Sequence, residues 1–482
     1  MSKVNMENQH NIPQQSPSTL NPKHIVILGG GFAGIGVLKK LQKEFDNDAS
    51  VEITLVDKGN FLLFTPMLPE IVSGMIETRH IVTPVRSFCK KAKFFEADVD
   101  LIDLKNREVN LKHSIGKQPK YPQQQPPIQQ QQQQQQQSDY LHKHTLKYDY
   151  LVLALGSENN FFGNSDVEEN AFTLKTINDG IVLRNHLIKI LEQANLEQDN
   201  HDLRKRLLTF VVVGGGFSGV ETVGAVNDFV RQTITQYYKN IYMSDVRVIL
   251  VSATDKILEQ IDEELGKFAL EKLKENGVEF IMNSKVKGAS KDKAILDNDT
   301  EIPCYSLIWT AGVTQNKLIA ELECEHDKGH RILTNEYLEV KNYEDVVYAL
   351  GDCASIPDPH TGKSYPPTAQ HAIRQADVAA KNIILSIKAN KMKKGMGIVD
   401  ENNMVRTMKK KFDYKTKGMM AQIGKRTGVA ILFGKLKLHG FIAWWLWRSY
   451  YLANLPTVKK KLKVMGDWTL DLFFKPDVSQ VQ

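Results

Sequence analysis

Two glycine-rich turns of nearly the same sequence constrain the fold of this chain more than any other feature. HIVILGGGFAGIG spans residues 24–36, and LTFVVVGGGFSGVE spans residues 208–221. In such a turn the first glycine permits a tight bend, the second lets the backbone approach a pyrophosphate, and the third lets a helix pack close to the strand. The glycines at these positions are Gly29, Gly31 and Gly34 in the first turn and Gly214, Gly216 and Gly219 in the second. Because each turn follows a Val/Ile-rich run and opens a helical pattern, two dinucleotide-binding units are predicted.

Strands alternate with helices around both turns. After the first turn, Val37, Leu38, Leu41 and Phe45 share one helical face, and residues 51–57 form the next predicted strand. After the second turn, strand 246–251 precedes a helix that a glycine stops, and another strand follows. Three more apolar runs lie at residues 151–157, 307–313 and 346–352, of which the first two are interpreted as paired crossover strands between two domains. The pattern predicts an α/β fold.

The residue that ends the second strand of each unit differs. Asp57 stands 23 residues after Gly34, where a carboxylate binds ribose hydroxyls, although a solvated strand-end aspartate is the alternative. The corresponding strand of the second unit ends in Ser252, with Asp255 and Lys256 beyond it. Without an acid there, repulsion of a 2′-phosphate is weaker. We expect NADH at the second unit and leave NADPH open.

Two dinucleotide sites in one chain imply two dinucleotides. One can be a bound flavin, and the other a nicotinamide that binds and leaves. The late stretch VVYALGDCA, residues 346–354, supports this interpretation. Its Gly351–Asp352 turn would place a carboxylate and backbone amides near the ribityl and phosphate groups of a flavin.

The cysteines and two polar tracts limit the class of protein. Cys89, Cys304, Cys324 and Cys353 are scattered with no Cys-x-x-Cys, which indicates a reducing compartment and excludes the dithiol of a disulfide reductase. Residues 1–22 are Pro/Gln-rich and are predicted to be a disordered tail, with little resemblance to an Arg-rich transit peptide. A second disordered tract is predicted as a surface insertion at about residues 114–145, around the run Gln129–Gln137.

The C-terminal region concentrates positive charge and tryptophan. Residues 431–465 hold seven Lys or Arg and no Asp or Glu, in a chain whose net charge is +6. GFIAWWLWRSYYLANL is shorter than the roughly 20 residues that a spanning helix needs. We therefore interpret it as an interfacial helix followed by a basic patch. A buried helix or a dimer interface is the alternative, and no nucleic-acid partner is expected because no such binding fold accompanies the lysines. The tryptophans are Trp444, Trp445, Trp447 and Trp468, and the patch is Lys459, Lys460, Lys461 and Lys463.

Several of these segments together resemble the type II NADH dehydrogenases, the single-chain NADH:quinone oxidoreductases of the two-dinucleotide-binding flavoprotein superfamily. The resemblance is carried by residues 61–86, GGGFSGVE, IWTAGV, YALGDCA, residues 365–376 and residues 412–424, and it covers residues 23–468. It implies two Rossmann-like domains and a C-terminal amphipathic membrane-binding region. The FAD-binding domain would comprise residues 23–167 and 307–388, the inserted NAD(P)H-binding domain 168–306, and the membrane-associating region 389–482.

The resemblance also implies an activity. Electrons would pass from NADH, through a tightly and noncovalently bound FAD, to a ubiquinone-like quinone without ion pumping. The enzyme would lie on a membrane surface, with the mitochondrial inner membrane as the expected location, and a homodimer stays open. The alternative is an NAD(P)H flavoprotein that resembles apoptosis-inducing factor and acts as an oxidase, a quinone reductase or a redox-sensing partner.

Three residues receive catalytic roles from the resemblance. Glu221 would lie near the nicotinamide–flavin contact, Gln370 at the flavin face that meets quinone, and Lys417 close to the quinone head group. The alternatives are a helix-dipole acid for Glu221, a helix-start hydrogen bonder for Gln370 and a solvated lysine for Lys417. Thr65 and Pro66 would lie beside the isoalloxazine. The other expected cofactor contacts are Phe32, Ala33, Lys58, Val99, Ala154, Gly156, Gly351, Asp352 and Ala369 for FAD, and Ser252, Ala311 and Gly312 for NAD(P)H. No metal ligand is expected.

Overall fold

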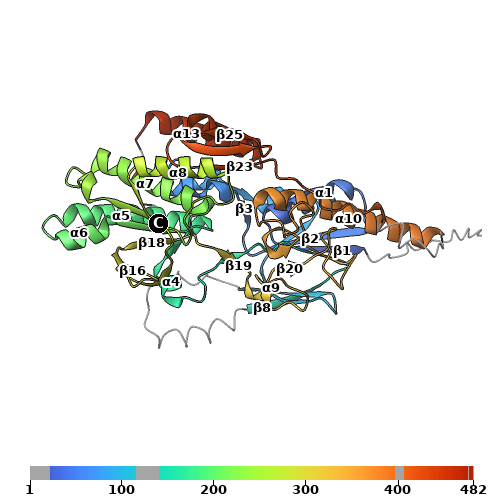
Figure 1. The fold of residues 1–482 in the computed structure, drawn as a ribbon. Coiled ribbons are helices and arrows are strands. Elements are labelled where there is room, and N and C mark those ends of the chain that lie inside the picture. Colours follow the sequence, from blue (N-terminus) through green and yellow to red (C-terminus); the bar gives the residue numbers. More distant parts are fainter. Residues whose placement is uncertain (1–21, 115–140, 397–406, 476, 481–482) are drawn as a thin grey trace, which may run out of the picture.

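The computed structural model describes residues 22–114, 141–396, 407–475 and 477–480. Most of the predicted N-terminal tail and of the glutamine-rich insertion therefore lies outside the described residues. Two five-stranded parallel sheets organise the chain (Figure 1). The first has the order β21-β9-β1-β2-β5 and the second the order β11-β18-β12-β13-β14. The α/β class and the two dinucleotide-binding units predicted from the sequence are confirmed.

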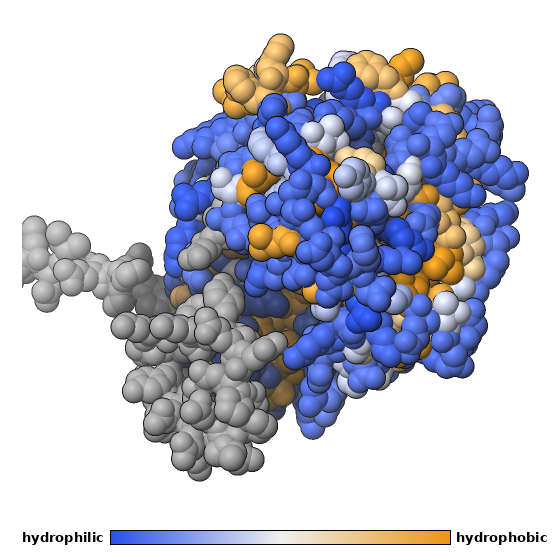
Figure 2. Space-filling view, turned by 90° about the vertical axis from the view of Figure 1, so that its left-hand side faces the viewer, coloured by the Kyte–Doolittle hydropathy of each residue, from blue (hydrophilic) through white to orange (hydrophobic). Residues whose placement is uncertain are grey.

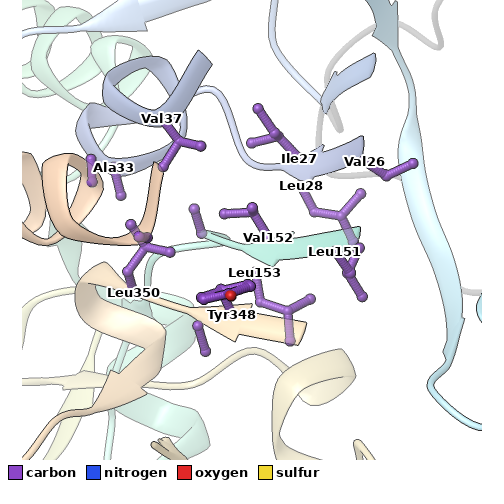
Figure 3. Packing of buried hydrophobic residues seen from close by; sticks show 14 of the residues in the cluster. Val26, Ile27, Leu28, Ala33, Val37, Leu151, Val152, Leu153, Tyr348 and Leu350 are labelled. Carbon is purple, nitrogen blue, oxygen red and sulfur yellow. The ribbon is translucent and has the colours of Figure 1, made fainter. Parts of the chain in front are cut away.

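The first sheet is built from apolar runs. Its strands are β1 (Lys23–Leu28), β2 (Val51–Asp57), β5 (Lys93–Glu96), β9 (Tyr150–Leu153) and β21 (Val347–Ala349). Helices α1 (Phe32–Glu44) and α10 (Ala369–Met396) lie against each other over one face (Figure 1). Figure 3 shows Val37 and Ala33 of α1 on one side of Val152 of β9 and Tyr348 of β21 on the other. Strands buried on both faces need such continuous runs of apolar side chains.

The second sheet repeats this arrangement. Its strands are β11 (Phe172–Thr173), β12 (Thr209–Val213), β13 (Arg247–Val251), β14 (Val278–Ile281) and β18 (Ser306–Trp309), and helices α5 (Ile177–Leu196), α7 (Phe217–Tyr237) and α8 (Glu263–Glu275) accompany it. β12 pairs in parallel with β13 and β18, as β1 does with β2 and β9. Asp262 caps α8, and Gly277 at φ +88° ends it, as the glycine stop in the sequence predicts.

The predicted pairing of two crossover strands is wrong in its detail. β9 lies in the first sheet and β18 in the second, so these strands do not pair with each other. Their continuations do, because β10 (Glu158–Asn159) pairs antiparallel with β19 (Val313–Thr314). This two-stranded ribbon joins the two domains beside the carboxyl ends of both sheets.

Smaller sheets extend the two domains. β6 (Asp98–Asp103), β7 (Glu108–Ser114) and β8 (Leu141–Lys147) form a meander in which Ser114 pairs with Leu141. The segment between β7 and β8 thus joins neighbouring strands, as expected for a surface insertion, but β8 begins four residues before the predicted end at 145. The remaining strands pair as β3 (Phe61–Leu63) with β4 (Val82–Pro84), β20 (Ile332–Leu333) with β22 (Ala354–Ser355), and β15 (Val286–Ser290) with β16 (Lys293–Leu296) and β17 (Glu301–Pro303). Short helices are α2 (Leu68–Val72), α4 (Ser165–Asn170), α6 (His201–Leu207) and α9 (Lys317–Ala320).

The C-terminal region is a folded module and not helices alone. β23 (Gly418–Gln422), β24 (Gly428–Leu432) and β25 (Leu436–His439) form an antiparallel sheet, followed by α12 (Gly440–Asn454) and α13 (Val458–Phe473). We call residues 418–473 the C-terminal module. It lies over α7 and α8 at the top of Figure 1 and also covers α2. Sequence reasoning missed this sheet, and its boundary at residue 388 falls inside α10.

Candidate active site

The first cleft follows the carboxyl ends of the first sheet and has a volume of about 970 Å³. A Cβ on Gly31 would meet no atom within 4 Å, so this glycine leaves its backbone open to the cleft. Gly34 has the other use, because a Cβ there would overlap the carbonyl oxygen of Gly29. The turn therefore combines an open cradle for phosphate with close packing of α1 on β1.

Asp57 lies at the end of β2 in this cleft. Its Oδ2 accepts a hydrogen bond from Gly30 N at 2.5 Å and its Oδ1 accepts one from Gly59 N at 2.7 Å. Burial raises the pKa of Asp57, and the two amides oppose that rise. A carboxylate fixed in this way keeps lone pairs that could accept hydrogen bonds from the hydroxyls of a ribose, the role expected from the sequence. The open glycine and the fixed acid both fit a dinucleotide.

The second cleft has a volume of about 860 Å³ and lies at the carboxyl ends of the second sheet. Gly216 again offers open space, and Gly219 packs against Gly214. Ser252 is buried at the end of β13, where a Cβ on Gly215 would lie 2.6 Å from its hydroxyl. Its Oγ lies 3.3 Å from Thr254 Oγ1. Ser252 thus stands where Asp57 stands in the first cleft, with a neutral hydroxyl in place of a carboxylate.

The two clefts meet at four residues that line both of them. These residues are Asn159, Lys175, Pro367 and Thr368. The two clefts are therefore adjacent at these residues. None of the four was singled out from the sequence.

Lys175 is the charged residue at this junction. Its Nζ donates to Ser157 Oγ at 2.9 Å, and Ser157 Oγ donates to Asp352 Oδ2 at 3.0 Å. Burial lowers the pKa of Lys175, while Asp352 opposes this. A signal was present in the sequence, because Lys175 stands between a short strand and the capping box of Thr176 and Asp179 that starts α5. That place at the end of a parallel-sheet strand is where ligands bind in such folds.

Most of the predicted cofactor contacts line the two clefts. In the first cleft they are Gly29, Gly31, Phe32, Ala33, Asp57, Lys58, Thr65, Val99, Ala154, Gly156, Gly351, Asp352 and Ala369, and in the second Gly214, Gly216, Ser252, Ala311 and Gly312. Gly34 and Gly219 support the turns from behind. Pro66 follows Thr65 in a 3-10 turn and does not line the cleft.

Glu221 lies outside both clefts, in a small cavity beneath the C-terminal module. Its Oε1 accepts hydrogen bonds from Trp447 Nε1 and from Gln422 N, both at 3.1 Å. Burial raises the pKa of Glu221 to about 8, against the effect of these two donors. The carboxyl group is one helical turn from Phe217, which lines the second cleft.

The other two predicted catalytic residues, Gln370 and Lys417, do not line either cleft. Gln370 is in the first turn of α10, directly after the cleft residue Ala369, and its carbonyl accepts from Arg374. Lys417 is exposed just before β23, and its carbonyl accepts from Phe433 N. The structure therefore brings Gln370 beside the first cleft but does not bring Lys417 into either cleft.

Known protein families and relatives match nearly the whole chain. Residues 23–376 match the family model for pyridine nucleotide-disulphide oxidoreductases, and residues 416–477 match the NDH2 C-terminal domain. The chain is 32% identical to the Dictyostelium discoideum protein named "Probable NADH dehydrogenase", over 97% of this chain and 93% of that protein. It is 31% identical to the external NADH-ubiquinone oxidoreductase 2 of Saccharomyces cerevisiae mitochondria, over 98% of this chain and 86% of that protein.

A solved structure agrees in fold. The structure of NDH2 from Plasmodium falciparum in complex with NADH superposes with a TM-score of 0.78 at 20% identity, covering 95% of this chain and 99% of that one. The match includes the C-terminal module as well as both dinucleotide-binding domains.

Proposed function

The chain belongs to the pyridine nucleotide-disulphide oxidoreductase family and, within it, to the type II NADH dehydrogenases, and from this we propose that it passes electrons from NADH through FAD to a membrane quinone. FAD is the tightly and noncovalently held cofactor of the first cleft. NADH enters the second cleft, and NADPH is a second donor that Ser252 does not repel. Bound FAD supplies the hydride-accepting and electron-donating chemistry.

The meeting of the two clefts is the observation that carries this proposal. Asn159, Lys175, Pro367 and Thr368 line both clefts, so a nicotinamide ring in one and a flavin ring in the other come into contact there. Lys175 places a positive charge at that contact, held by Ser157 and Asp352. A fixed charge where electron density moves is how such a site stabilises a transition state.

The C-terminal module supports the membrane part of the proposal. Phe441, Ile442 and Trp445 of α12 are more than half exposed. Apolar side chains lie along the upper edge of the molecule in Figure 2, the edge at which Figure 1 places this module. Among the described residues, none of the helices has the length and apolar character to cross a bilayer. We propose peripheral attachment to the mitochondrial inner membrane, a location that the mitochondrial relatives support, and a homodimer remains part of the proposal.

Titration of the purified protein tests the function. Anaerobic NADH should bleach the bound flavin, and a short-chain quinone should restore its colour, while oxygen does so slowly. NADPH in the same experiment measures the choice of donor. A colourless protein that binds no added FAD, or a flavin that quinone does not reoxidise, would contradict the proposal.

A further inference from the structure

An exposed aromatic side chain lies at the mouth of the second cleft. Phe162 lines this cleft and is 67% exposed. Its neighbour Phe161 stacks on Trp309 with ring centroids 6.0 Å apart, whereas Phe162 meets the same indole edge-on at 6.4 Å. A single exposed apolar residue is ordinary on a protein surface. In a ligand cleft, however, such a residue gains stability when a ligand covers it.

The backbone fixes the position of Phe162. Its φ is +54°, in the left-handed region that residues other than glycine rarely adopt, and Gly163 follows at φ +76°. Phe162 N donates to Asn160 Oδ1 at 2.8 Å, and Asn160 N donates to the carbonyl of Gly312 at 3.0 Å. The carbonyl of Asn160 accepts from Trp309 Nε1 at 2.8 Å. The turn that carries the exposed ring is therefore tied to β18 and to the residue before β19.

The ring lies along the half of the second cleft that ends at the junction with the first. A Cβ on Gly312 would lie 3.1 Å from Phe162 Cζ, so the ring rests on a backbone that has no side chain of its own. Gly312 precedes Val313, which pairs with the junction residue Asn159. Ser252, the residue expected at the adenosine ribose, follows β13, and β12 separates β13 from β18. Phe162 is therefore on the side of the cleft away from the adenosine.

We propose that Phe162 positions the donor by stacking its ring on the nicotinamide riboside half of NADH. The inference rests on the proposed function, which places NADH in this cleft. Stacking depends on the π-faces of the two rings and not on a hydrogen-bond pattern. Phe162 therefore raises the affinity for NADH and NADPH alike, because the two donors share this half. In this respect its role differs from that of Ser252, which acts on the 2′-phosphate.

Four substitutions separate stacking from apolar burial. F162A removes the ring, F162L keeps apolar volume without an aromatic plane, and F162Y and F162W keep the plane. All four retain a Cβ, so the left-handed backbone is equally strained in each.

F433A is the matched control. Phe433 also has a φ of +54°, is 74% exposed and precedes a glycine in the left-handed region, Gly434. It lies in the turn between β24 and β25 and lines neither cleft. The Tm of each variant shows that the fold is kept.

Calorimetric titration of the FAD-loaded protein with NAD+ gives a readout that needs no turnover. We expect F162A and F162L to bind NAD+ about tenfold more weakly, as when a stacking aromatic is lost. F162Y, F162W and F433A should bind it as the natural protein does. ADP-ribose, which lacks the nicotinamide, should bind F162A and the natural protein equally.

Two outcomes of the titration would overturn the inference. Binding of NAD+ at the natural strength by F162A or by F162L would show that the aromatic plane contributes nothing. An equal loss for NAD+ and ADP-ribose in F162A would show that the ring acts on the adenosine half.

Steady-state kinetics separates positioning of the donor from the chemical step. In F162A the KM for NADH and the KM for NADPH should rise together, while the rate at saturating NADH stays within about twofold of the natural rate, because the contact is the same before and during hydride transfer. A fall in kcat at an unchanged KM would overturn the inference. If the natural protein binds neither NAD+ nor NADH, the proposed function fails instead.

Discussion

Trp447 Nε1 donates a hydrogen bond to Glu221 Oε1 at 3.1 Å, across 226 residues of sequence. The bond joins α12 of the C-terminal module to the first turns of α7. A helix that presents Phe441 and Trp445 to its surroundings thus also holds a buried acid near the second cleft. The module therefore contacts the helix whose first residues line the second cleft, and under the proposed function it would also face the membrane.

The W447F variant tests this bond. The N–H of Trp447 stabilises the carboxylate of Glu221 and lowers its pKa, so its loss should raise that pKa further. A bond to a charged group contributes about 1.5 to 3 kcal/mol, which corresponds to a shift of about one pH unit or more. We expect the alkaline limb of quinone reduction to move to higher pH. W444F is the matched control, because Trp444 is also buried on α12 but its Nε1 has no partner among the described residues.

A second contact of the module is expected to govern stability. Arg448 donates to Glu70 Oε1 at 3.3 Å, and Trp468 Nε1 donates to Glu70 Oε2 at 3.0 Å. The guanidinium also lies 4.4 Å from the ring centroid of Trp444. Burial raises the pKa of Glu70, which Arg448 opposes. Removing one partner of a buried pair leaves an uncompensated charge and costs about 3 to 5 kcal/mol.

R448M should therefore lower the free energy of unfolding by about that amount, measured by denaturant titration. The double variant E70Q/R448M removes both charges and should recover part of the loss. If the double variant is as unstable as the sum of the two single variants, the two side chains act independently and the pair is not the cause.

Lys175 is expected to act in the first half-reaction. It lines both clefts and contacts Ser157, so K175M should slow anaerobic flavin reduction by NADH about tenfold or more while FAD stays bound. K317M is the control, because Lys317 lines the first cleft alone and forms an exposed ion pair with Glu321. An equal effect of both variants would indicate a general loss of positive charge and not a role at the junction.

The sequence predicted the parts of the fold that follow from local pattern. The glycine spacing, the buried strands and Asp57 all depend on residues close together in the chain, and all were found. Lys175 was missed because its importance comes from the meeting of two clefts that separate domains provide. The three-stranded sheet of the C-terminal module was missed although β24 is an apolar run, GVAIL, because its partners β23 and β25 are only partly buried or exposed.

The positions of Glu221 and of the side chains on α12 also depend on contacts between residues far apart in the chain. Glu221 was expected at the nicotinamide–flavin contact, but its place beneath Trp447 depends on chain 226 residues away. For the apolar run of α12 the sequence analysis left an interfacial helix, a buried helix and a dimer interface open, and the structure shows a helix that is buried on one face and exposed on the other. Trp447 and Arg448 are buried against the core, while Ile442 and Trp445 are exposed. Which residues fall on which face depends on contacts with α2 that no local pattern contains.

The choice of nicotinamide is expected to depend on Ser252. S252D would place a carboxylate in the second cleft, at the position equivalent to that of Asp57 in the first cleft. This carboxylate should repel the 2′-phosphate of NADPH. We expect kcat/KM for NADPH to fall about tenfold or more, a loss of about 1.4 kcal/mol or more in transition-state stabilisation, with a smaller change for NADH. S252A removes the hydroxyl without adding charge and should leave the ratio of the two donors unchanged. A parallel loss for both donors in S252D would point to distortion of the turn at Gly215.

Membrane attachment is expected to depend on the exposed apolar face of α12. Deleting the chain from Leu438 would remove this face, but it would also strip Trp447 and Trp468 from the core beneath them. The triple variant F441S/I442S/W445S changes exposed residues alone and should keep the fold and the bound flavin. It should lose binding to vesicles that contain anionic lipid in a flotation assay, because burial of apolar side chains and attraction of lysines both contribute to such binding. L196S/Y242S, which alters exposed apolar residues of the second domain, should float as the natural protein does. Flotation of the triple variant at the natural level would show that the lysines of α13 or another surface hold the membrane.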